Sequence, residues 1–115
     1  MSDQEALRRF KAETFKALAH PTRIAVVELL RDQGEVGVMR IYEQLGVEQA
    51  NASQHLALLR ACNVVSARKE GNQVFYSLRD KRLGRILDLM RDYFHAHLSE
   101  SLALLQSIES EKARK

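Results

Sequence analysis

The segment from Leu45 to Val65, LGVEQANASQHLALLRACNVV, limits the possible folds of this chain more than any other. Gly46 ends one apolar-periodic segment, and a new helix is expected to begin about three residues later. One face of this helix carries apolar residues at four- and three-residue steps: Ala52, Leu56 and Leu59. The other carries side chains that both donate and accept hydrogen bonds: Gln49, Asn51, Ser53 and Gln54. This arrangement predicts a helix-turn-helix whose second helix enters a DNA major groove.

The length and composition of the chain indicate one soluble domain, residues 1–115. The single cysteine excludes an internal disulfide framework and is typical of a reducing cytoplasm. The charged amino terminus lacks the apolar core of a signal peptide, and no run approaches the roughly 18 apolar residues of a membrane span. We therefore expect a cytoplasmic protein with no membrane partner.

Charge is segregated along the chain, although the net charge is only +3. Seven basic and two acidic residues lie between Arg60 and Arg85, a balance of +5. Five acidic residues and two arginines lie between Glu28 and Glu48, a balance of −3. Such segregation is expected of a phosphate-binding face. Charge alone leaves the alternative equally open, in which scattered charge merely solvates the surface.

The periodicities elsewhere predict a mainly α chain with a small β-hairpin. Further helices are expected over residues 3–17, 21–31, 39–45 and 80–110, with a very short strand over residues 35–38. The second helix of the helix-turn-helix should end near Cys62, because Asn63 suits the left-handed residue that follows a helix. Alternating residues 64–69 and 73–78, joined by Glu70-Gly71-Asn72, predict a hairpin with a basic arm, which in this position is a wing.

The last predicted helix has an apolar stripe that is longer than a small domain can cover, which indicates a second copy as partner. The stripe consists of Leu83, Leu87, Met90, Phe94, His97, Ser101, Leu104 and Ile108. His97 and Ser101 interrupt it, either to set the register of pairing or because the seam rotates onto Leu98, Leu102 and Leu105. The first helix, with Leu7 and Phe10 on its stripe, either joins this interface or packs on its own domain.

Three segments in order, FKALAHPTRIAVVELL, LGVEQANASQHLALLRACNVV and ARKEGNQVFYSL, resemble the ArsR/SmtB family of winged-helix repressors. The resemblance covers roughly residues 10–83. It implies a homodimer that pairs through its first and last helices, binds a two-fold operator in double-stranded DNA and is released by an inducer. Dimer contacts are therefore expected from Leu7, Phe10, Leu87, Met90, Phe94, His97 and Leu98.

Helical geometry assigns the residues that would read DNA. If the apolar residues point inward, then Ala50, Gln54, Ala57 and Ala61 point outward. Gln54 is the best candidate for a base contact because its amide can bind adenine through two hydrogen bonds, and Ser53 can serve either base. Gln49 and Asn51 lie in the first turn of the helix, which enters the groove first. His55 lies about 60° from the centre of the buried face and is interpreted as a partly buried structural residue.

The wing is expected to set affinity rather than sequence choice. Arg60, Arg68 and Lys69 would contact phosphates, and Asn72 or Gln73 at the tip would reach the minor groove. A solvent-exposed hairpin without a ligand is the alternative.

The metal-ligand motifs of the family are missing here. The family's Cys-x-Cys positions are occupied by Gly37 and Met39, and its second ligand set corresponds to Asp80, Arg82, Tyr93 and Ala96, of which only the aspartate is retained. His95, His97 and Glu100 have spacing that could hold zinc, but they lie off the family register and are interpreted as surface or seam residues. We expect no metal and no cofactor, and no residue identifies the inducer.

Cys62 is expected to be buried and unreactive, because the family usually has a small residue there and thiol sensing normally needs a second cysteine. A disulfide between subunits is less favoured. Four histidines, one cysteine and no phosphate-binding loop leave no catalytic constellation, so an enzyme is not expected. The sequence predicts a sequence-specific DNA-binding repressor, with a winged-helix protein-interaction module as the alternative.

Overall fold

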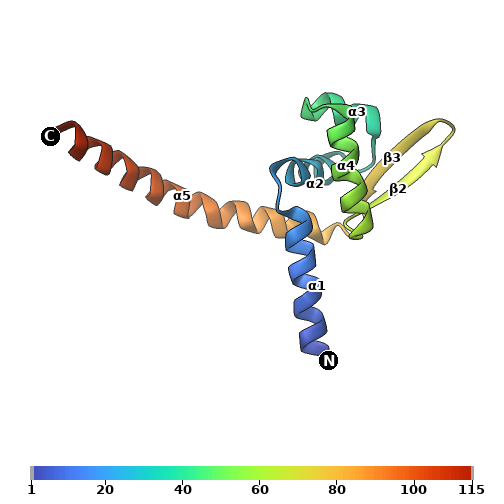
Figure 1. Ribbon diagram of the computed structural model, residues 1–115, viewed down its shortest axis with the longest axis horizontal. Coiled ribbons are helices and arrows are strands. Elements are labelled where there is room, and N and C mark those ends of the chain that lie inside the picture. Colours follow the sequence, from blue (N-terminus) through green and yellow to red (C-terminus); the bar gives the residue numbers. More distant parts are fainter. Residues whose placement is uncertain (1, 115) are drawn as a thin grey trace. The chain divides into compact units, whose positions relative to one another are not determined.

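The computed structural model of the protein, which describes residues 2–114, contains five helices and three strands within that range (Figure 1). The element order is α1 (Asp3–Leu18), α2 (Pro21–Gln33), β1 (Val36–Gly37), α3 (Val38–Leu45), α4 (Gln49–Ala61), β2 (Val65–Glu70), β3 (Gln73–Leu78) and α5 (Arg82–Arg114). The chain divides into two compact units, Met1–Gly84 and Arg85–Lys115. None of the described helices is long and apolar enough to cross a membrane. The expected fold class, a winged helix-turn-helix, is confirmed.

The core of the first unit lies among α2, α3 and α4. Its fully buried large side chains are Val26, Val27, Leu30, Ile41, Leu56 and Leu59. Both valines of α2 point inward, whereas Ile24 is only half-buried. Pro21 occupies the first turn of α2, where its fixed φ suits the helix and its missing N–H leaves no bond unmade.

The turn between α3 and α4 depends on Gly46, which has φ 61° and ψ 31°. This left-handed conformation carries little penalty in glycine, and the Gly46 N–H donates to the Tyr42 carbonyl at 3.0 Å. Glu48 then occupies the N-cap of α4 and makes no side-chain capping bond. At the other end of α4, Asn63 has φ 60° and reverses the chain into β2.

The sheet is larger than the predicted hairpin because β1 pairs with β3 and makes β3 the central strand. Both pairings are antiparallel, with Val36 opposite Tyr76 and Val65 opposite Leu78. Gly71 (φ 61°) and Asn72 form a two-residue turn, which moves β2 one residue later than predicted. We call the β2–β3 hairpin, residues 65–78, the wing.

The final helix begins two residues later than predicted because Asp80 caps it. The Asp80 Oδ1 atom accepts the N–H of Arg82 at 2.9 Å, which satisfies one of the unpaired donors at the start of a helix. The 33 residues of α5 run past Ser110, the predicted end, and correspond to a length of about 50 Å.

Candidate nucleic-acid interface

One face of α4 is buried and the opposite face is exposed, as the apolar spacing predicted. Ala52, Leu56 and Leu59 are at most 1% exposed. The outward positions are all exposed: Gln49, Ala50, Asn51, Ser53, Gln54, Ala57 and Ala61. The short side chains on this face leave Gln54 unobstructed. A helix that inserts into a major groove requires an exposed face of this kind. We call α4 the recognition helix.

A hydroxyl–hydroxyl contact joins the two helices of the helix-turn-helix. The Tyr42 Oη atom on α3 lies 2.9 Å from the Ser53 Oγ atom on the recognition helix, and either oxygen can donate. Sequence reasoning identified Ser53 and missed Tyr42. The only available signal was the tyrosine itself, whose polar tip needs a partner when its ring is half-buried.

A pair of histidines lies on the inner flank of the recognition helix. The His55 and His20 ring centroids are 4.2 Å apart, and the His20 Nδ1 atom accepts the N–H of Thr22 at 3.1 Å to cap α2. Desolvation lowers the pKa of His55, and the neighbouring His20 and Arg23 add to this effect. His55 is half-buried, so its interpretation as a partly buried residue is confirmed.

The wing presents several of the expected DNA-facing side chains to solvent. Lys69 lies near the end of β2, Asn72 and Gln73 lie at the turn, and all three are exposed, as is Arg60 on the recognition helix. No carboxylate among the described residues pairs with Arg60 or Lys69. Both cations are therefore available to a phosphate.

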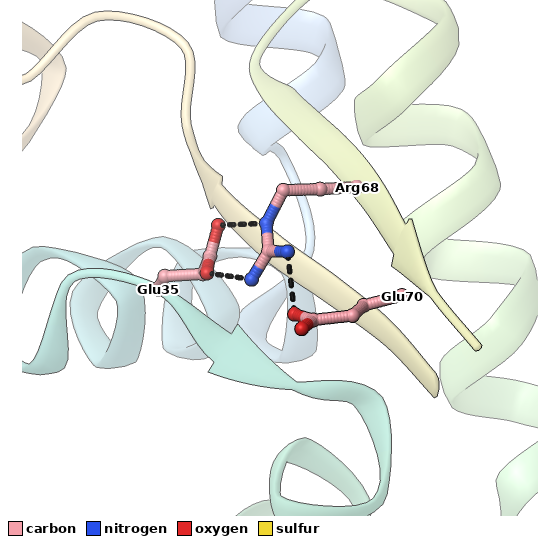
Figure 2. A network of polar contacts seen from close by, with 3 residues as sticks. All are labelled: Glu35, Arg68 and Glu70. Carbon is pink, nitrogen blue, oxygen red and sulfur yellow. Dashed lines mark hydrogen bonds and ion pairs between the residues drawn. The ribbon is translucent and has the colours of Figure 1, made fainter. Parts of the chain in front are cut away.

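Arg68, another expected phosphate contact, is bound to two carboxylates (Figure 2). Its Nε and Nη2 atoms donate to the Glu35 carboxylate at 3.1 and 2.6 Å, and Nη1 donates to Glu70 at 2.7 Å. The hydrogen bonds from Arg68 are the main cause that lowers the pKa of Glu35. We call Glu35, Arg68 and Glu70 the wing triad.

Other cations of the basic segment also have partners within the chain. The Arg79 Nη1 atom donates to the Asn63 side-chain oxygen at 2.7 Å, and Arg82 forms an ion pair with Asp80 at 2.6 Å. The sequence balance of +5 already counts Glu70 and Asp80, and Glu35, which lies outside the segment, lowers it to +4.

The prediction that Cys62 is buried is wrong, because its side chain is exposed. Cys62 is the C-cap of the recognition helix, so it lies beyond the last residue whose direction follows the helical period. The reversal at Asn63 then brings Val64, which is only 4% exposed, into the core in place of Cys62.

No three His, Cys, Asp or Glu side chains within residues 2–114 of this single chain are arranged to hold a metal ion. The His97 Nδ1 atom lies 3.9 Å from a Glu100 oxygen, and the His97 ring contacts Tyr93 with centroids 4.4 Å apart.

The residues expected at a dimer interface differ in exposure. Leu7 and Phe10 on α1 are 54% and 68% exposed. On α5, Leu87 is buried and Met90 half-buried, while the later members are exposed: Phe94, His97 and Leu98. The apolar stripe of α5 would rotate onto three further leucines, and all three are exposed: Leu98, Leu102 and Leu105.

Comparison with known proteins places these features in one family. The family model "Bacterial regulatory protein, arsR family" matches residues 20–67. The chain is 35% identical over 108 residues to the uncharacterized HTH-type transcriptional regulator Rv0081 of Mycobacterium tuberculosis, spanning 94% of this chain and 95% of that protein. It is 35% identical over 81 residues to the biofilm growth-associated repressor of Agrobacterium fabrum, spanning 70% of this chain and 68% of that protein.

Solved structures give the same result. The crystal structure of Rv0081 matches with a TM-score of 0.74 and 37% identity, covering 84% of this chain and 96% of that one. The solution structure of the homodimeric winged helix-turn-helix DNA-binding domain Mb0332 from Mycobacterium bovis matches with a TM-score of 0.75 and 32% identity, covering 87% and 93%. These similarities support a regulator over a protein-interaction module.

Proposed function

Because this chain belongs to the ArsR family of bacterial regulatory proteins, we propose that it represses transcription as a homodimer bound to a two-fold symmetric operator. As a member of this family, it is a DNA-binding transcriptional regulator. Repression, the operator and release by an inducer are the proposed part.

The exposed face of the recognition helix is the observation that carries the proposal. Its amide and hydroxyl side chains lie opposite a fully buried apolar face, so the helix can enter a groove without exposing core residues. We propose that Gln54 and Ser53 contact bases, with Gln49 and Asn51 at the first turn. Arg60 and Lys69 would contact phosphates, and Asn72 or Gln73 would reach the minor groove.

The exposed apolar side chains of α1 and α5 support the proposal of a homodimer. Phe10, Phe94 and Leu98 are each more than half exposed, which is unusual for large apolar side chains in a monomer. A second copy would bury them and would also place two recognition helices on successive major grooves, as a two-fold operator requires.

The test is a fluorescence anisotropy titration of the protein against a duplex from the DNA upstream of its own gene. A random duplex of equal length and base composition is the matched control, and both are measured at the same moderate salt concentration. We expect binding to the upstream duplex that is at least about a thousandfold tighter, the lower range for specific recognition. Equal affinity for the two duplexes would contradict the proposal.

A further inference from the structure

Arg68 occupies a row that runs across all three strands of the sheet. Its backbone is opposite Phe75 of β3, and Phe75 is in turn opposite Gly37 of β1. The guanidinium carbon lies 4.9 Å from the centre of the Phe75 ring. Because β3 separates β2 from β1, the side chain must pass over β3 to reach Glu35, which directly precedes β1 (Figure 2). Arg68 therefore connects the outer strand of the wing to the segment that leads into the helix-turn-helix.

The charge of the wing triad opposes a phosphate at this position. One guanidinium between two carboxylates leaves a net charge of −1, and three of the five N–H donors of Arg68 are already engaged. A DNA phosphate close enough to bind Arg68 would also lie close to the carboxylates of Glu35 and Glu70, and these would repel it. Lys69, the next residue along β2, has no such neighbour among the described residues and suits a phosphate better.

The form of the contact points to the local geometry of the wing rather than to the global stability of the fold. The three side chains are between 41% and 69% exposed, and exposed ion pairs contribute little to folding. The bond to Glu35 nevertheless has two parallel N–H···O contacts, which fix the relative orientation of the two groups. The ring of Phe75 lies against one face of the guanidinium and restricts its movement further.

We infer that Arg68 is a positioning residue: with Glu35 and Glu70 it fixes the angle of the wing, and it makes no phosphate contact of its own. The inference rests on the proposed DNA-binding function and changes the role expected for one of its residues. It assigns the phosphate contact of this strand to Lys69.

The salt dependence of binding separates the two roles. A residue that neutralises a phosphate releases counterions, and its removal makes the slope of log K against log salt shallower by about 0.9 for each phosphate that is no longer neutralised. A residue that positions the wing lowers affinity without this change. We would titrate the upstream duplex across a series of salt concentrations with Arg68→Gln, Arg68→Lys, Glu35→Gln and, as the matched control, Lys69→Gln.

We expect Lys69→Gln to make the slope shallower by about 0.9 per bound subunit. Arg68→Gln should weaken binding at an unchanged slope, because no phosphate loses its cation. Arg68→Lys keeps the charge and loses the planar fork, so it should bind about two- to fivefold more weakly. Glu35→Gln should do the same. If Arg68→Gln makes the slope shallower by about 0.9 per bound subunit, or if Glu35→Gln binds as well as or more tightly than the original protein, Arg68 is a phosphate contact and the inference fails. If Arg68→Lys binds equally well, the planar fork has no positioning role and the inference fails too.

A second measurement needs no DNA and therefore separates this inference from the proposed function. Amide hydrogen exchange in the free protein should accelerate in β2 and β3 for both Arg68→Lys and Glu35→Gln, and remain unchanged for Lys69→Gln. Unchanged exchange in all three variants would overturn the positioning role. A failure to prefer the upstream duplex would instead count against the proposed function.

Discussion

At the scale of single residues, we propose that Gln54 determines sequence choice. Its side chain lies on the exposed face of the recognition helix, between the small residues Ala50 and Ala57, so its amide can approach a base edge. We expect Gln54→Ala to relax preference at one base position of each half-site, at a cost of about 1–3 kcal/mol for the preferred base.

The measurement for Gln54 is anisotropy against duplexes in which each position of the preferred sequence is changed in turn. Ala61→Ser, on the same face but at the far end of the helix, is the control and should leave the pattern unchanged. A uniform loss across all duplexes would show that Gln54 does not read a base.

The Tyr42–Ser53 contact offers another prediction at this scale. Tyr42→Phe removes one hydroxyl and leaves the Ser53 Oγ atom without its partner on α3. We expect DNA binding to weaken by about 0.5–1.5 kcal/mol, the net value of a neutral hydrogen bond. Because the two side chains share one bond, Tyr42→Phe and Ser53→Ala should be non-additive in a double-mutant cycle. Additive losses would show that the hydroxyls act independently.

At the scale of elements, the histidine pair couples the recognition helix to the start of α2 and predicts a pH dependence. The pKa of His55 is lower in the folded protein than its ordinary value of about 6.5. As the pH falls below about 6.5, the unfolded chain therefore binds more protons at this histidine than the folded protein does. The stability that the folded protein has above this pH decreases as the pH falls toward the lowered pKa. We expect the melting temperature to fall between pH 7.5 and 5.5, and His55→Gln to reduce that fall.

The exposed His95 supplies the control for this experiment, because His95→Gln should leave the pH dependence as it is in the original protein. The pH range also separates His55 from the wing triad. Because the pKa of Glu35 is lowered, the stabilisation from its ion pair with Arg68 is lost only as the pH falls below about 4.5, the ordinary pKa of this carboxyl group. If His55→Gln and His95→Gln gave the same pH profile, the coupling would be refuted.

The elements that the sequence predicted well are those whose signal is local. The spacing of Ala52, Leu56 and Leu59 sufficed to orient the recognition helix, because a helical period determines both faces at once. The partners of Arg68 were not predictable in this way. Glu35 lies 33 residues away in sequence, and only the pairing of β1 with β3 brings it near.

The prediction that Cys62 is buried rested on the small residue that the family usually has at this position, and it was wrong. The direction of this side chain depends on the backbone reversal at Asn63 rather than on a period that extends through it. Sequence patterns therefore predicted which face of the recognition helix is exposed, and they misjudged side chains whose surroundings are set by a turn or by a distant strand.

At the scale of the whole molecule, the exposed apolar side chains of α5 predict dimerisation. Leu98 is 56% exposed, and burial in a partner is the simplest reason for its row of exposed leucines, which includes Leu102 and Leu105. We expect Leu98→Glu to shift the protein toward monomer in sedimentation velocity runs and to weaken operator binding about tenfold or more, because two linked half-site interactions become separate events.

Ala103→Glu adds the same charge to the same helix about 140° away from Leu98 and is the matched control. It should leave both mass and affinity unchanged. If Leu98→Glu remained a dimer with full affinity, the seam would have to lie elsewhere on the molecule.

The exposed position of Cys62 has a practical consequence. As the sole cysteine of the chain, it offers one thiol for a maleimide dye, and no residue has to be replaced first. The dye would be attached at the carboxyl end of the recognition helix, where its emission should respond to a nearby duplex. Donor and acceptor dyes on two copies would also report their separation by energy transfer, so the original protein already carries the attachment point for an optical sensor of its own assembly.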